Sequence, residues 1–179
     1  MMSLTSAFWL FVVLFALIGA MRGWAKELLV TFSIILALFI LSVMERYVPP
    51  VHDFFAQPNG TPEFWTRIVI TLVLVFFGYQ TPNIQRLAGA RFVRERLSDT
   101  LLGLVLGAVN GFLLMGTLWY FMEQSNYPYP QFISAPDPNT AFGVSAKVLL
   151  PYLAPRWLGV PAIFFAVALF SLFVLVVFI

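Results

Sequence analysis

The sequence predicts an all-α fold: a polytopic helical membrane protein with about five transmembrane helices. Two observations predict this class. Hydrophobic residues make up 61% of the 179 residues, charged residues only 10%, and the mean hydropathy is +0.92, whereas a soluble domain carries about 25% charged residues. Several apolar runs also approach the roughly 20 residues that a helix needs to cross a bilayer. Helices satisfy their backbone polar groups internally in lipid, so we expect these runs to be helical.

The rest of the composition excludes several functional classes. The net charge of +2 is too small to indicate a nucleic-acid-binding protein. Cysteine is absent, which excludes disulfides, thiol chemistry and cysteine-based metal sites. The N-terminus lacks the charged region and small-residue cleavage site of a signal peptide, so we interpret the first apolar run as a retained span.

The first two spans are predicted at residues 4–21 and 28–44. Only "RGWAKE" separates them, so we expect a tight antiparallel hairpin in which Gly19 and Gly23 help the chain to turn. One long helix through both runs would leave three charges at membrane depth, at roughly 2.5–3.5 kcal/mol for each charge. We therefore reject the single helix.

The next elements alternate between loops and spans. Residues 45–63 contain four prolines and are predicted to form a loop. The third span is predicted at residues 64–81, with Arg67 snorkelling outward from its start. A short basic helix is expected at residues 85–99, and the fourth span at residues 100–122.

A linker and a fifth span follow. Residues 126–157 are rich in Pro and Tyr and form a predicted extramembrane linker, within which residues 141–153 suit a short amphipathic element on the membrane. The fifth span is predicted at residues 158–179, with Ser171 as its only polar side chain. The predicted organisation is a four-span domain at residues 1–125, the linker, and a C-terminal transmembrane helix.

The distribution of Lys and Arg predicts the orientation. Six of the ten follow the first and third spans, and four lie on the other side. The positive-inside rule then predicts an outside N-terminus and an inside C-terminus. The arginines either bind anionic lipid heads, at about 1 kcal/mol each, or only set the topology. The predicted cytoplasmic charge cluster consists of Arg22, Glu27, Arg86, Arg91, Arg94, Arg96 and Asp99.

The fourth span carries a stripe of small residues. Glycines recur every four residues after Asp99, and Asn110 is expected on the same side of the helix. Such stripes let a second helix approach closely, and an amide can hydrogen-bond across the contact. We favour packing over a helix interface that lines a site. The predicted helix-packing motif consists of Gly19, Gly23, Gly103, Gly107, Gly111 and Asn110.

The spacing of the first two glycines matches that stripe. We infer that the first span packs on the start of the fourth, which would bring Arg22 and Glu27 near Asp99. Because an acidic residue contributes little to membrane orientation, we expect Glu27 to form a salt bridge with Arg22 or with the loop arginines.

No candidate catalytic, cofactor-binding or metal-binding residue emerges. We expect no ionisable side chain deep inside a span, which argues against a pump or proton-coupled transporter but not against a passive pore lined by Asn110. His52, beside Asp53, is interpreted as a solvated interfacial residue because no nucleophile motif accompanies it.

Two stretches together resemble a known family. "GAMRGWAKEL" and "SDTLLGLVLGAVNGFLL" are similar to the two signatures of the colicin V production protein (CvpA-like) family of bacterial inner-membrane proteins. The resemblance covers about residues 5–125 and implies a small multi-span protein of the bacterial cytoplasmic membrane, linked to export and envelope maintenance, with no defined reaction or cofactor. The chain departs from the family pattern at Asn110, where members often carry Arg, and in its fifth span.

Two functional hypotheses follow. The first is a non-enzymatic CvpA-like protein that acts in export or envelope homeostasis. The second is an accessory or structural subunit of a larger respiratory or photosynthetic membrane complex, favoured by the extra apolar span. The expected partners are membrane lipid and either other membrane-protein subunits or further copies of the chain, with no nucleic acid and no cofactor.

Overall fold

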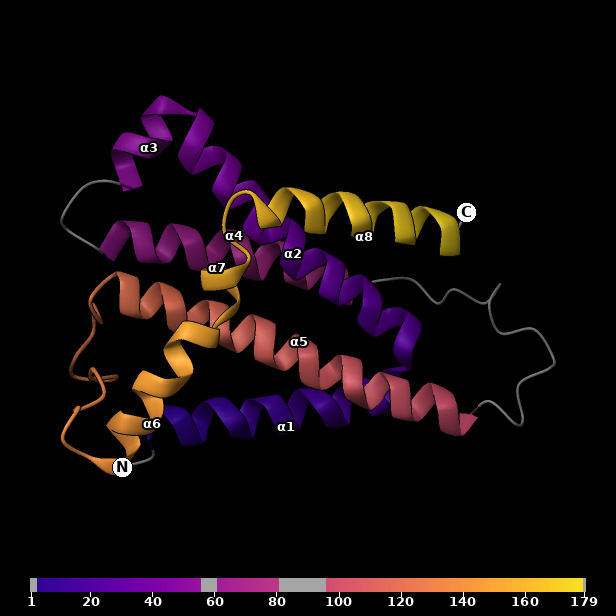
Figure 1. The fold of residues 1–179 in the computed structure, drawn as a ribbon, viewed down its shortest axis with the longest axis horizontal. Helices are drawn as coiled ribbons and strands as arrows, with labels where there is room; N and C mark the ends of the chain where they lie inside the picture. Colours follow the sequence, from indigo (N-terminus) through magenta and orange to yellow (C-terminus); the bar gives the residue numbers. More distant parts are fainter. Residues whose placement is uncertain (1–2, 56–60, 81–95, 179) are drawn as a thin grey trace.

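The computed structural model describes residues 3–55, 61–80 and 96–178 (Figure 1). These residues form helices and contain no strand, which confirms the all-α prediction. In chain order the elements are α1 (Leu4–Arg22), α2 (Trp24–Tyr47), α3 (Pro49–Phe55), α4 (Thr61–Tyr79), α5 (Arg96–Gln124), α6 (Ala141–Leu149), the 3₁₀ turn η2 (Leu150–Tyr152), α7 (Ala154–Trp157) and α8 (Ala162–Phe178).

Four of the described helices are long and apolar enough to cross a membrane: α1, α2, α4 and α5. The segment from α6 to α7 meets α8 at a bend of 63°. If the segment and α8 together form one span, the structure has a fifth crossing. The polytopic helical prediction is therefore confirmed as four to five candidate spans. Helix α8 begins at Ala162 rather than at residue 158, because Pro161 cannot occupy a helix interior.

Helix α5 lies at the centre of the bundle. It packs along α1 on one side and against α2 on another, while α4 and α8 pack on α2 (Figure 1). The predicted tight hairpin is therefore wrong for the two helices. Gly23 alone joins α1 to α2, but the helices splay apart because α5 enters between them.

The bundle has two distinct ends. The α1–α2 corner, the end of α4 and the start of α5 gather at one end, and the C-terminus of α8 points the same way (Figure 1). The N-terminus, α3, the start of α4 and the end of α5 lie at the other end. The alternating direction of the five long helices accounts for termini at opposite ends.

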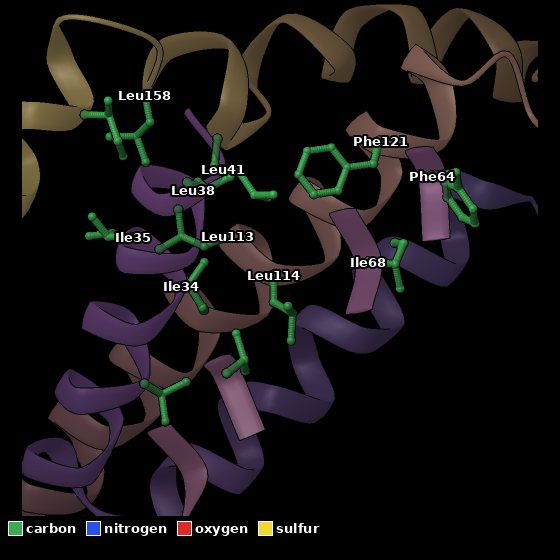
Figure 2. Close-up of a cluster of buried hydrophobic side chains, with 14 residues drawn as sticks. Ile34, Ile35, Leu38, Leu41, Phe64, Ile68, Leu113, Leu114, Phe121 and Leu158 are labelled. Atoms are coloured by element: carbon green, nitrogen blue, oxygen red, sulfur yellow. The ribbon is translucent and has the colours of Figure 1, made fainter. Parts of the chain in front are cut away.

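The hydrophobic core fills the space between α2, α4 and α5 (Figure 2). Helix α2 supplies Ile34, Leu38 and Leu41, and α5 supplies Leu113 and Leu114, all at most 5% exposed. In lipid, association of this kind depends on close van der Waals packing rather than on removing apolar surface from water. The apolar side chains therefore divide between this interior and a broad lipid-facing exterior.

The loop predictions need correction at residues 45–63. Helix α2 continues to Tyr47, and Pro49 and Pro50 begin the short helix α3 rather than a loop. Proline is tolerated in the first turn of a helix, where its missing N–H would have no intrahelical partner. Most of the basic helix expected at residues 85–99 falls on residues 85–95, which lie outside the described residues.

The predicted linker is packed onto the bundle rather than free of it. Ala146 of α6 and Leu153 belong to one buried cluster with Phe8 and Val12 of α1 and Trp119 of α5. Thr140 caps α6 by accepting a hydrogen bond from the N–H of Gly143 at 3.1 Å. Residues 141–157 therefore cover the ends of α1 and α5 before the chain returns along α2 as α8 (Figure 1).

Candidate functional site

The corner between α1 and α2 is built around Gly23. Its φ of +84° lies in a region that residues with a side chain rarely adopt. The N–H of the next residue, Trp24, donates to Oδ1 of Asp99 on α5 at 3.0 Å, so a carboxylate caps α2 at the end where the helix dipole favours negative charge. A Cβ atom at Gly23 would lie only 2.7 Å from that oxygen. The corner therefore needs glycine for its backbone angle and for the space that Asp99 occupies.

Helices α1 and α5 meet backbone to backbone beside this corner. A Cβ atom at Gly19 would overlap the carbonyl oxygen of Gly103, and one at Gly107 would overlap the carbonyl oxygen of Phe15. Further along α5, a Cβ atom at Gly111 would lie 2.9 Å from Cβ of Phe15. The glycines of both sequence stretches thus lie in one contact, in which the missing side chains allow the close approach typical of small-residue stripes in membranes.

Glu27 lies one turn into α2 and is fully buried. Nη1 of Arg22 donates to Oε1 of Glu27 at 2.6 Å, the ion pair expected from the sequence. Nη2 of Arg22 donates to the carbonyl oxygen of Tyr79 at 3.1 Å, and the guanidinium lies 4.3 Å from the centre of the Tyr79 ring. Arg22 therefore joins the end of α1 to α2 and to the end of α4.

Asn110 of α5 completes this cluster from the opposite side. Its Nδ2 donates to Oε2 of Glu27 at 2.8 Å and to the carbonyl oxygen of Glu27 at 2.9 Å. The hydroxyl of Thr31 lies 2.6 Å from Oδ1 of Asn110 and 3.1 Å from the same carbonyl oxygen, and its one proton serves either acceptor. Both protons of the amide, its oxygen and both carboxylate oxygens of Glu27 thus have partners inside the protein.

The side chains of Arg22, Glu27, Thr31 and Asn110 bind one another and so hold the helices together, rather than forming a reactive centre. We call these four residues the lock. A buried carboxylate is tolerated because a guanidinium neutralises it and hydrogen bonds satisfy its oxygens. Removing one partner of such a pair leaves an uncompensated charge and costs about 3–5 kcal/mol in measured cases. The cluster therefore ties α1, α2, α4 and α5 together at one end of the bundle.

Two expectations about the site are corrected by this geometry. Asn110 does not face the helix that the glycines face: the glycines contact α1, whereas the amide contacts Glu27 and Thr31 of α2. Glu27 was expected in the turn before the second span, but it lies inside α2, one turn from the helix start, and is fully buried. Of the predicted charge cluster, Arg22, Glu27 and Asp99 surround the corner. Arg96 begins α5, whereas Arg86, Arg91 and Arg94 lie outside the described residues.

A second ion pair, between a buried arginine and a partly exposed glutamate at the other end of the bundle, was not predicted. Arg67 of α4 is 4% exposed, and its Nε donates to Oε1 of Glu45 on α2 at 2.9 Å. Its guanidinium lies 4.6 Å from the ring centre of Phe55 on α3. The expected outward snorkelling does not occur, because Glu45 and the aromatic ring satisfy the cation inside the bundle. The spacing of Glu63 and Arg67, one turn apart in a hydrophobic helix, is the sequence signal for this inward polar face.

The remaining candidates do not form a reactive site among the described residues. The imidazole ring of His52 and the carboxylate of Asp53 are largely solvent-exposed, and Nδ1 of His52 lies 3.4 Å from Oδ1 of Asp53. This exposure agrees with a solvated histidine. Within residues 3–55, 61–80 and 96–178, no three His, Asp or Glu side chains are grouped as metal ligands.

Comparison with known proteins identifies a family. A family model described as "Colicin V production protein" matches residues 4–135, which run from the start of α1 past the end of α5. No curated protein and no solved structure matches the chain. The match includes both sequence stretches that form the glycine contact and the polar corner, and it ends before α6.

Proposed function

Because the chain belongs to the colicin V production protein family, we propose that it is a non-enzymatic inner-membrane protein that acts in export or envelope homeostasis. One observation carries the proposal. The motif residues at the corner satisfy one another's charges and hydrogen bonds inside the bundle, from Arg22 and Glu27 to Asn110. Residues of a catalytic or solute site would instead leave polar groups directed at a substrate.

The proposed role of this lock is to hold the outer helix faces in one arrangement. Helix α1 exposes Trp9, Leu10 and Leu14, and α8 exposes Phe165 and Leu169. Such faces suit lipid or other membrane-protein subunits, which include further copies of the chain. The partners we propose are therefore membrane lipid and protein subunits that dock on faces set by the corner.

The orientation belongs to the same proposal. We place the N-terminus outside and the C-terminus inside the cell, because six of the ten Lys and Arg residues follow the first and third predicted spans in the sequence. The position of the termini at opposite ends of the bundle supports an odd number of crossings (Figure 1).

The functional proposal is tested by deleting the gene and measuring detergent sensitivity and protein export of the cells. We expect a defect that the wild-type chain restores and that Gly107→Leu, which blocks the helix contact, does not. The matched control is Ser171→Leu, because Ser171 lies on α8 and is exposed. Normal envelope function and normal export in the deletion strain would contradict the proposal.

A second candidate function is supported by the C-terminal elements. Helices α6 to α8 lie outside the family match, and α8 adds an apolar surface beside α2. This addition favours an accessory subunit of a larger membrane complex. Purification in mild detergent separates the two candidates: stoichiometric co-migration with large redox or pigment subunits supports the accessory role, whereas an isolated oligomer argues against it.

A further inference from the structure

The inner face of α4 carries polar side chains at intervals of one turn. Glu63, Arg67 and Thr71 follow at four-residue spacing and are 7%, 4% and 0% exposed. In a soluble protein a polar stripe usually faces solvent, but here it faces the interior of the bundle. Ionisable residues in transmembrane segments almost always face a bundle interior or a water-filled cavity.

Arg67 shows which helices this stripe faces. Its Nε contacts Glu45 of α2 at 2.9 Å, and its guanidinium lies 5.9 Å from the ring centre of Phe121 on α5. The stripe therefore lies along the seam between α2, α4 and α5. Phe55 of α3, 4.6 Å from the guanidinium, stands at the end of this seam.

The helix register brings two hydroxyl groups to the same depth of the seam. Helices α4 and α5 run in opposite directions (Figure 1), and Arg67 lies opposite Phe121. One turn further along α4 is Thr71, and one turn back along α5 is Thr117, so these residues share one level. Both side chains are fully buried, and neither hydroxyl has a hydrogen-bond partner among the described residues. Oε1 of Glu63, two turns away, has none there either.

We propose that this seam binds water along a polar inlet that enters beside α3, passes Glu63 and Arg67, and ends between Thr71 and Thr117. Water is the ligand that fits, because it donates and accepts hydrogen bonds, and a buried water needs two to four polar partners. The inlet ends there because the next turn holds buried apolar side chains: Val75 of α4, together with Ile34 and Leu113 of the core cluster. Figure 2 shows Ile34 and Leu113 within that cluster. This apolar layer separates the inlet from the cluster around Asn110.

The absence of cysteine from the chain allows a direct test. Thr71→Cys and Thr117→Cys each place a single thiol at the end of the inlet with little change in volume. Infrared spectroscopy of the full chain in lipid follows exchange of S–H to S–D after transfer to D₂O, which requires water to reach the thiol. We expect both thiols to exchange at least roughly tenfold faster than the thiol of Val75→Cys, one turn further along α4. Val75 is 4% exposed, so simple burial does not distinguish it from the two threonines.

Two results would overturn the inlet. Exchange at positions 71 and 117 as slow as at position 75 would show that water does not reach the hydroxyls, and equally fast exchange at all three would show general opening. A second measurement, unfolding of Thr71→Val and Thr117→Val, guards against cysteine variants that fold poorly. Water-bonded hydroxyls predict a lower unfolding midpoint for each valine variant, whereas hydroxyls without partners predict a higher one. Thr66→Val is the control, since its hydroxyl bonds the Pro62 carbonyl at 2.8 Å on the exposed side of α4.

Discussion

Replacing Asn110 with leucine tests the lock at the α1–α2 corner. Leucine has nearly the shape of asparagine but can neither donate nor accept a hydrogen bond. The substitution removes both amide donors from Glu27, one at 2.8 Å from Oε2 and one at 2.9 Å from the carbonyl oxygen. Thr31 loses its 2.6 Å acceptor but keeps the carbonyl oxygen of Glu27 at 3.1 Å. The unpaired Oε2 of a fully buried carboxylate is the main consequence.

The magnitude follows from these contacts. A hydrogen bond to a charged group contributes about 1.5–3 kcal/mol to stability, and a neutral interhelical bond in a membrane averages about 0.6 kcal/mol. Leucine gains little in return, because the alternative surroundings of an apolar side chain are equally apolar lipid tails. We therefore expect Asn110→Leu to lower the free energy of unfolding by about 3 kcal/mol.

The assay is denaturant titration of the full chain in mixed micelles, followed by far-UV circular dichroism. Val109→Leu is the matched control: its side chain is the sequence neighbour of Asn110, is 40% exposed and faces away from the polar cluster. We expect this control to remain within about 0.5 kcal/mol of the wild type. An Asn110→Leu variant equally close to the wild type would refute the lock, because it would show that the buried hydrogen bonds contribute nothing to stability.

Three further outcomes are expected. Gly107→Leu should reduce the yield of folded protein far more than Ser171→Leu, since any Cβ at Gly107 overlaps the backbone of α1; equal yields in detergent would contradict a tight glycine contact. Arg67→Gln should destabilise the chain by about 2 kcal/mol, because Glu45 loses its cation. The exposed neighbour Val69→Leu serves as a control, and an unchanged free energy of unfolding for Arg67→Gln in the mixed-micelle titration would contradict this role. In whole cells, an impermeant maleimide should label Ser134→Cys and not Ser98→Cys. Both serines are exposed: Ser98 lies in the first turn of α5 and Ser134 follows the end of α5, and the two ends of α5 lie at opposite ends of the bundle (Figure 1). The reverse pattern would invert the proposed orientation.

The spans were predictable because the preference of a segment for lipid depends on the hydropathy of its own residues. The predicted runs at residues 4–21 and 100–122 differ from α1 and α5 by only a few residues. Helix α2 extends beyond its predicted run at both ends: it begins at Trp24 rather than at residue 28 and ends at Tyr47 rather than at residue 44. Charged residues at the corner indicated a loop, whereas the structure needs only Gly23 to turn, so Lys26 and Glu27 belong to the helix.

The packing motif was predictable in composition but not in geometry. Four-residue glycine spacing in two separate spans indicated a close helix contact, and Gly19 and Gly107 do lie in one. The amide of Asn110 was expected on that same face, yet it contacts α2. A helical projection shows which residues share a face of one helix, but it does not show which helix packs against that face. Helix α5 packs against α1 on one side and α2 on another.

The sequence by itself determined that the chain forms several membrane-spanning helices, roughly where each begins, and which small and polar residues must be hidden from lipid. Only the tertiary structure decided that α5 enters between α1 and α2, and therefore that Glu27 meets Asn110 83 residues later. The physical reason is that hydropathy measures the preference of a segment for lipid, which every span shares. Which helices pack together depends on backbone shape and on the pairing of buried polar groups. Both depend on contacts between segments far apart in the chain.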